Sequence, residues 1–217
     1  MATENLTLAQ FFATDRNPFN YSKVEQINRD VTTAWLTLSD ITAQLNLFGD
    51  ESQDDYLVNL ELATRFAIED YLGMAIFATQ YRTYYGDPGI YNTALFLDLP
   101  EVSQGMSGVT VNAVGYWSGN PPTLQTLATT GYFYDPTGNR VVVNSLPQTL
   151  SQYNANPIEV VYTANANILS TYPVIKQAGL LLLTHLYNNR ANTTVGQLKE
   201  IPFGVATLLR PYKPLVM

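Results

Sequence analysis

A long helix with two apolar faces is the feature that most limits the possible folds of this chain. Over about residues 53–72 the apolar residues recur every three or four positions, and Gly73 follows as a C-terminal stop. One stripe is assigned to the core of the chain, and its members are Leu57, Leu60, Ala63, Thr64, Ala67, Ile68 and Tyr71. A second stripe lies nearly opposite the first and consists of Val58, Leu62 and Phe66. Two opposed apolar faces predict either a helix sandwiched within one chain or a helix that also contacts another subunit.

Charged residues mark the start of this helix and run along one side of it. Acidic residues crowd its first turn, where the helix dipole favours negative charge, namely Asp50, Glu51, Asp54 and Asp55. Beside the core stripe, Glu61, Arg65 and Glu69 follow one another at i, i+4 spacing, which predicts a charge ladder along the helix. A shorter helix is expected just before, over residues 41–45, because Thr37 and Asp40 have the spacing of a capping box.

The middle of the chain, from about residue 77 to residue 164, has the pattern of strands and turns. Alternating, β-branched or aromatic residues predict five strands, over residues 79–85, 109–114, 132–134, 141–143 and 158–162. Between the third and the fourth lies a reverse turn, residues 135–139, in which Pro136 sets φ and Gly138 accepts a positive φ. These two strands should therefore form a hairpin.

The remaining segments are one helix and the two ends of the chain. A helix is predicted from Pro173, in its first turn, to Arg190, and since it is apolar nearly all round we expect it to be the buried central helix. Residues 191–200 are polar and predict an exposed loop, which a last short element follows. Residues 1–36 lack a sustained apolar period and are expected to form an arm with at most one short helix.

Together these patterns predict an α+β fold. We expect a small α-helical bundle with an inserted antiparallel β-rich region of about five strands and extended N- and C-terminal arms. The expected boundaries are an N-terminal arm in residues 1–36, a helical body in residues 37–74 and 172–190, the inserted β-rich region in residues 75–165, and a loop and C-terminal tail in residues 191–217. A chain of 217 residues can bury such a core without disulfides, and this one has no cysteine.

The residues that carry most enzyme chemistry are missing or unsuitably spaced. The one histidine, His185, lies on the most hydrophobic helix and is expected to be structural, and a zinc or copper site would have to be built from carboxylates. The sequence contains no Gly-x-Ser-x-Gly elbow, no phosphate-binding loop and no Gly-x-Gly-x-x-Gly turn. Glu69 and Asp70 are adjacent on a helix and diverge by ~100°, which does not suit a cooperating acid/base pair. We therefore predict a non-enzymatic protein without a cofactor or a metal.

The tyrosine-rich middle of the chain offers a possible binding surface. Aromatic rings that could stack on bases or sugars are Tyr81, Tyr84, Tyr85, Tyr116, Trp117, Tyr132, Tyr134 and Tyr162. Single-strand binders place basic residues among such rings, whereas between residues 66 and 175 only Arg82 and Arg140 are basic. Strand propensity is the simpler explanation of these aromatics. A carbohydrate-binding β-domain stays open as an alternative.

Charge is distributed unevenly along the chain. The net charge is −7, but residues 1–175 hold six Lys/Arg against seventeen Asp/Glu, and residues 176–217 hold five against one. An acidic body repels free nucleic acid, and the basic end either docks on an acidic surface or is simply solvated. The N-terminus lacks a signal-peptide pattern and no apolar run approaches the ~20 residues of a membrane span. The sequence therefore predicts synthesis in the cytoplasm and no membrane segment.

Three segments carry a resemblance to a known family. The first two are residues 37–45 and residues 63–72 closing on Gly73. The third is the distinctive one, and it consists of Pro173-Val174-Ile175-Lys176-Gln177-Ala178, Leu186-Tyr187-Asn188-Asn189-Arg190 and Ile201-Pro202-Phe203-Gly204-Val205-Ala206-Thr207-Leu208-Leu209-Arg210-Pro211-Tyr212-Lys213. Taken in order, they resemble the head-tail connector (adaptor) proteins of tailed bacteriophages, over about residues 37–213.

The resemblance implies a structural subunit of the virion neck, synthesised in a bacterial host. Such subunits form a ring, usually a dodecamer, that is seated under the portal protein, meets tail, tail-terminator or nozzle proteins below, and passes double-stranded DNA through its bore without sequence specificity. The stripe Val58, Leu62 and Phe66 is then the expected subunit contact. The expected portal-docking residues are Ile201, Pro202, Phe203, Leu208, Leu209, Arg210, Tyr212 and Lys213. Another phage neck or tail-completion protein, which would lack the portal partner, is the alternative.

Overall fold

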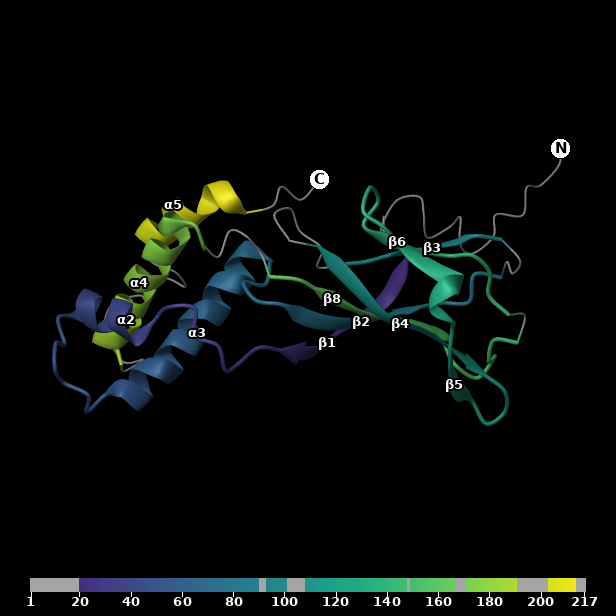
Figure 1. Ribbon diagram of the computed structural model, residues 1–217, viewed down its shortest axis with the longest axis horizontal. Helices are drawn as coiled ribbons and strands as arrows, with labels where there is room; N and C mark the ends of the chain where they lie inside the picture. Colours follow the sequence, from purple (N-terminus) through teal and green to yellow (C-terminus); the bar gives the residue numbers. More distant parts are fainter. Residues whose placement is uncertain are drawn as a thin grey trace. The chain divides into compact units, whose positions relative to one another are not determined.

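The computed structural model of the chain divides into two compact units, a β unit and a helical unit (Figure 1). The structure describes residues 20–89, 93–100, 108–147, 149–166, 171–190 and 203–213. Of these, the β unit holds residues 20–29, 79–89, 93–100, 108–147 and 149–165, and the helical unit holds residues 30–78, 166, 171–190 and 203–213. Helices and antiparallel strands are both present, so the predicted α+β class is confirmed.

A five-stranded antiparallel sheet is the larger part of the β unit. Its order is β1-β2-β8-β4-β5, with bounds Tyr21–Arg29, Thr79–Tyr85, Ile158–Ala164, Val109–Ser118 and Thr123–Thr126. Alternate side chains of β2 are buried because successive side chains point to opposite faces of a sheet. Tyr81 lies opposite Tyr162 of β8, and Tyr85 lies opposite Ile158. All four are buried, so one face of the sheet forms the core of the unit.

A second sheet has three strands in the order β3-β7-β6, with bounds Leu95–Asp98, Arg140–Val143 and Tyr132–Asp135. A short 3-10 turn, η1 (Thr129–Gly131), leads into β6. The predicted hairpin is confirmed by the pairing of β6 with β7. The residue with positive φ in its turn is Asn139 (φ 50°) rather than the predicted Gly138. Thr137 Oγ1 and Arg140 Nε both donate hydrogen bonds to the Asp135 carboxylate, which lowers the pKa of Asp135 to about 2. These bonds connect the two ends of the turn.

The described part of the chain contains eight strands, more than the five or so predicted. The additional strands are short or lie at a sheet edge, where few side chains are buried and the apolar alternation is weak. β1 occupies residues 21–29, which the sequence assigned to an arm, and Trp35 and Leu36 after it are buried in the helical unit. The prediction of an arm is therefore wrong for residues 21–36, and residues 1–19 lie outside the described residues.

The helical unit contains α2 (Leu38–Leu45), α3 (Asp54–Leu72), α4 (Pro173–Asn188), α5 (Phe203–Leu209) and the 3-10 turn η3 (Arg210–Tyr212). The predicted capping box is confirmed, since the Asp40 amide donates to Thr37 Oγ1 and the Thr37 amide donates to Asp40 Oδ2. Gly73 ends α3 in the left-handed conformation (φ 66°), as predicted. Within the described residues, none of the helices has the length and apolar character that a membrane span requires.

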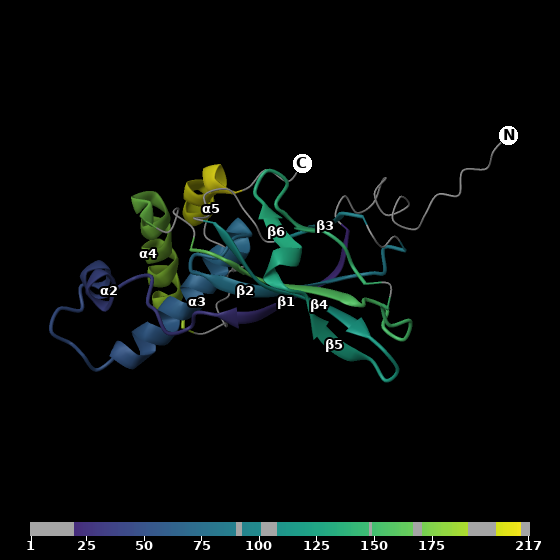
Figure 2. The same cartoon turned by 45° about the vertical axis from the view of Figure 1, so that its right-hand side comes forward.

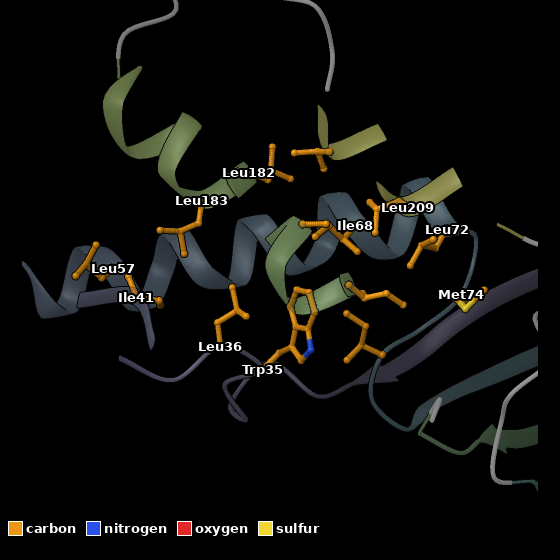
Figure 3. Close-up of a cluster of buried hydrophobic side chains, with 14 residues drawn as sticks. Trp35, Leu36, Ile41, Leu57, Ile68, Leu72, Met74, Leu182, Leu183 and Leu209 are labelled. Atoms are coloured by element: carbon orange, nitrogen blue, oxygen red, sulfur yellow. The ribbon is translucent and has the colours of Figure 1, made fainter. Parts of the chain in front are cut away.

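These helices enclose one hydrophobic core (Figure 3). Its buried members are Trp35, Leu36, Ile41, Leu57, Ile68, Leu72, Met74, Ile76, Ile175, Ala178, Leu182, Leu183, Val205 and Leu209. α4 and α5 lie on the same side of α3 in both ribbon views (Figures 1 and 2). Trp35 packs against α4 at Gly179, where a Cβ atom would lie 2.7 Å from the indole ring. The sequence predicted α4 to be the buried central helix because it is apolar nearly all round. Val174 and Leu181 are each 38% exposed, so only one face of α4 enters the core.

Candidate assembly surfaces

The first candidate surface is the second apolar stripe of α3, formed by Val58, Leu62 and Phe66 and called here the α3 stripe. Val58 is 49% exposed, and Leu62 and Phe66 are half-buried. None of the three belongs to the hydrophobic core, which α3 enters through Leu57, Ile68 and Leu72. The structure thus places the α3 stripe on the surface of the isolated chain, where its contact with another subunit stays a prediction.

The charges expected to form a ladder along α3 are buried instead. Glu61, Arg65 and Glu69 are 3%, 1% and 5% exposed. Glu61 Oε1 accepts hydrogen bonds from the amides of Trp35 (2.9 Å) and Leu36 (3.2 Å), and Glu69 Oε1 accepts one from the amide of Ile76 (2.8 Å). A buried charge needs such partners because desolvation otherwise disfavours it strongly.

Arg65 completes this set of buried contacts. Its guanidinium donates to the carbonyl oxygens of Thr33 (2.7 Å) and Asp30, and it lies 4.9 Å from the centroid of the Phe77 ring. Residues 30–36 follow β1 and residues 74–78 precede β2. Both connecting segments are therefore fastened to one helix, and we call Glu61, Arg65 and Glu69 the α3 clamp.

Replacing Arg65 by lysine is expected to lower the free energy of unfolding by about 1.5–3 kcal/mol, because an ammonium group cannot reproduce the two-pronged guanidinium and one charge-assisted hydrogen bond is lost. Urea unfolding measures the change. Arg210→Lys is the control, since Arg210 is exposed. A change for Arg65→Lys no larger than that of the control would contradict the importance of these bonds.

The second candidate surface is the C-terminal segment predicted to dock on a portal. Its described part does not reach away from the body, because α5 packs into the helical unit with Val205 1% and Leu209 0% exposed. Tyr71 Oη donates to the Ala206 carbonyl (3.3 Å), and the rings of Tyr172 and Tyr212 meet edge to face at 5.9 Å. The prediction of an extended C-terminal arm is therefore wrong for residues 203–213.

The individual docking residues fall into three groups. Leu209 is buried, and Leu208 and Tyr212 are half-buried against the core, so these three stabilise the unit. The exposed members are Arg210 and Lys213, and Lys213 Nζ also lies 5.1 Å from the Tyr71 ring centroid. Ile201 and Pro202 lie outside the described residues, as does the side chain of Phe203. Docking on a portal stays a prediction, and its accessible basic groups are Arg210 and Lys213.

His185 lies near the C-terminus of α4, where a local cap engages it. The Asn189 amide donates to the His185 carbonyl (3.1 Å), and Asn189 Nδ2 donates to the same oxygen (2.7 Å) and lies 3.4 Å from His185 Nδ1. Among the described residues, no three histidine, aspartate or glutamate side chains come together in a group that could hold a metal ion. This environment fits the structural role expected for His185.

Several rings of the tyrosine-rich middle are not available to a ligand. Tyr81, Tyr85 and Tyr162 are 6%, 2% and 0% exposed, and the rings of Tyr81 and Tyr162 stack at 5.7 Å inside the sheet. Tyr85 Oη donates to the carbonyl of Asp98 on β3 (2.7 Å) and so ties the two sheets together. These contacts weaken the carbohydrate-binding alternative, since rings that fill a core cannot stack on a sugar.

The opposite face of the five-stranded sheet carries a charge cluster. Arg82 of β2 lies between Glu25 of β1 and Glu159 of β8, with a nitrogen-to-oxygen distance of 3.9 Å to each carboxylate. Burial raises the pKa of Glu159, and the charge of Arg82 opposes that rise. The alternation of β2 indicated which of its residues would share a face, but only the sheet order brings these three strands together.

Some apolar residues are exposed although the sequence pattern did not indicate it. Phe96 of β3 and Phe133 of β6 flank Val142 across the three-stranded sheet and are 45% and 55% exposed. Phe48, between α2 and α3, is 75% exposed. Their only signal was apolar character in a short strand or a turn, which does not distinguish an exposed ring from a buried one.

No protein-family model and no curated protein matches the chain. Solved structures do. A chain from the neck of an empty gene transfer agent (GTA) particle computed with C6 symmetry superposes with a TM-score of 0.60 at 20% identity, covering 90% of this chain and 97% of that chain. The chain has the fold of that neck component.

Two further structures match over the same extent. A chain from the virion of a native GTA particle gives a TM-score of 0.57 at 20% identity, and one from the neck of a native GTA particle computed with C12 symmetry gives 0.55 at 19% identity. Each match covers 90% of this chain and 97% of the other. Since the likeness spans nearly the whole of each chain, the β unit and the helical unit both belong to the shared fold.

Proposed function

We propose that this chain is a non-enzymatic structural subunit of the neck of a tailed-phage-like particle. The supporting observation is the fold shared with neck chains of GTA particles over 90% of this chain. In the finer proposal, the subunit is a head-tail connector that forms a ring between the portal protein and the tail, and the virion neck is its location. The two necks are computed with sixfold and twelvefold symmetry, which agrees with a cyclic arrangement of subunits.

The proposed ring needs a contact between identical subunits, and the α3 stripe supplies an apolar surface for it. A contact between different surfaces of identical chains generates a ring when its rotation closes. The exposed Val58 and the half-buried Leu62 and Phe66 lie along one face of a 19-residue helix. A rigid helix suits this role because the geometry of each contact must repeat around the ring.

The charge distribution supports passage of DNA and docking at a portal. Residues 1–175 carry seventeen acidic side chains against six basic ones, so phosphates that slide past an acidic bore find little counter-charge to hold them. Arg210 and Lys213 are exposed basic groups and would dock on an acidic portal surface. The proposed DNA contact is therefore repulsive and independent of sequence, and the protein contact is attractive.

Electron microscopy of the purified chain, alone and mixed with the portal protein of the same particle, tests the proposal. We expect closed rings, with twelve subunits the leading expectation, that co-purify with the portal. Rings that never bind the portal would favour a tail-completion protein instead. Monomers in both samples at high protein concentration would overturn the proposed function.

A further inference from the structure

One face of the three-stranded sheet carries a row of apolar side chains, Phe96, Val142 and Phe133, called here the aromatic row. The register places Phe96 and Phe133 on either side of Val142, so the row crosses all three strands. The two rings are 45% and 55% exposed, whereas Leu97 and Val141 on the other face are buried. A sheet that buries one face usually turns polar side chains to solvent on the other, so two exposed rings in one row indicate a contact.

The aromatic row is short and has a charged border. Two residues along β7 from Val142, Arg140 Nε donates to Asp135 Oδ2 (3.0 Å), and the guanidinium carbon lies 4.7 Å from the centroid of the Phe96 ring. With neighbouring strands about 4.8 Å apart, the row is about 10 Å long. A stable contact between two subunits buries about 800 Å² on each of them. The row is therefore the right size for a short segment of chain and too small for a second folded surface.

The chain enters the described structure beside this row, at Asn20. The Asn20 amide donates to Asp98 Oδ2 (3.2 Å), and the Asp98 amide donates to Asn20 Oδ1 (3.0 Å). Asn20 Nδ2 also donates to the carbonyl oxygen of Phe96. Within the described residues, β3 pairs with a strand on one side only, where β7 lies, and Asn20 occupies its other edge. Everything that precedes Asn20 in the sequence therefore starts next to Phe96.

The sequence before Asn20 contains a segment of suitable length and character. Residues 6–12 read Leu-Thr-Leu-Ala-Gln-Phe-Phe, with four large apolar side chains in seven positions, and residues 13–18 are mostly polar. When extended, residues 13–19 can span about 23 Å, more than twice the length of the aromatic row. A segment on so short a tether has an effective concentration of about 1 mM, which favours it over a separate molecule.

We propose that residues 6–12 pack on the aromatic row of the same chain and cover Phe96 and Phe133. Phe11 and Phe12 are the expected contacts, because aromatic pairs gain more than their buried area alone provides. The inference concerns a single subunit and does not depend on the proposed ring. It also means that the aromatic row is occupied within the subunit and is not a docking surface for another protein of the particle.

Photo-cross-linking of the full chain tests the contact. Phe133→p-benzoylphenylalanine replaces one aromatic side chain by another at an exposed position, on the strand farthest from Asn20. After irradiation of a mixture of isotope-labelled and unlabelled chain, we expect cross-linked peptides that join position 133 to residues 6–12 of the same molecule. The control is Phe48→p-benzoylphenylalanine in the helical unit, where Phe48 is 75% exposed, and it should give no cross-link to residues 6–12.

A second variant tests whether the two rings of the segment are needed. Phe11→Ser with Phe12→Ser, added to the position 133 variant, should lose the cross-link, and circular dichroism should stay unchanged because neither residue belongs to the core of the described structure. The proposal is overturned if position 133 gives no cross-link, if its cross-links reach other residues or join labelled to unlabelled chains, or if the serine variant cross-links as before. A cross-link between labelled and unlabelled chains would assign the aromatic row to a second copy instead.

Discussion

A variant that carries Leu62→Asp and Phe66→Asp is expected to be a folded monomer that forms no rings. Both residues lie outside the hydrophobic core, so the helical unit should tolerate the change. In an assembled ring the two carboxylates would be buried against a neighbour without partners, and each unpaired buried charge costs several kcal/mol. Negative-stain electron microscopy measures ring formation, and circular dichroism with thermal unfolding shows whether the variant is folded.

The control for this variant places the same charge elsewhere. Ser39→Asp with Ala43→Asp introduces two aspartates four residues apart on α2, where both positions are exposed. This control should form rings like the unmodified chain. If the α3 variant still forms rings, the α3 stripe is not part of the contact between subunits and the assignment of the contact is wrong.

A second large change, in the free energy of unfolding, is expected when the C-terminal segment is altered. Leu209 is fully buried, so Leu209→Ala should lower the free energy of unfolding by about 2–5 kcal/mol through lost apolar contact and the cavity left behind. Truncation of residues 201–217 removes Val205 as well and should destabilise the helical unit further. Urea unfolding followed by circular dichroism is the measurement.

Arg210→Ala is the matched control because Arg210 directly follows Leu209 but is exposed. It should change stability by no more than about 0.5 kcal/mol, the usual range for surface positions. An unchanged urea midpoint for Leu209→Ala would show that α5 detaches easily from the core. If the expected loss is found, portal docking is better tested by substituting Arg210 and Lys213 than by truncation, since truncation changes stability and docking together.

Local signals in the sequence predicted the parts of the fold that depend on neighbouring residues. The capping box at Thr37, the stop at Gly73 and the hairpin joining β6 to β7 all have chemistry confined to a few positions. β1 was missed because it is an edge strand whose partner β2 lies about fifty residues away, and its mixed polar sequence shows no apolar alternation. The long-range pairing that stabilises it leaves no local trace.

In the candidate surfaces, too, the sequence predicted what depends on local periodicity and missed what depends on tertiary packing. Periodicity was enough to place Val58, Leu62 and Phe66 on a common face of α3. It could not separate the exposed Leu181 from the buried Leu182 on α4, since nearly every position of that helix is apolar and burial there depends on α3, α5 and Trp35. Spacing likewise predicted that Glu61, Arg65 and Glu69 would interact with one another, whereas the hydrogen bonds described above join them to backbone groups brought close by the tertiary fold.

The α3 clamp has a mechanical consequence for the chain. A force that pulls on β1 or on β2 reaches the helical unit through residues 30–36 or residues 74–78. Both segments are held to α3 by charge-assisted hydrogen bonds. The force on either connecting segment is therefore transferred to side chains within α3, and the hydrogen bonds of the clamp must break before the core residues separate. The hydrogen bonds of the clamp go to main-chain amides and carbonyls and so depend on the identity of three helix residues, while the buried side chains of Trp35, Leu36 and Ile76 hold the connectors by apolar packing as well.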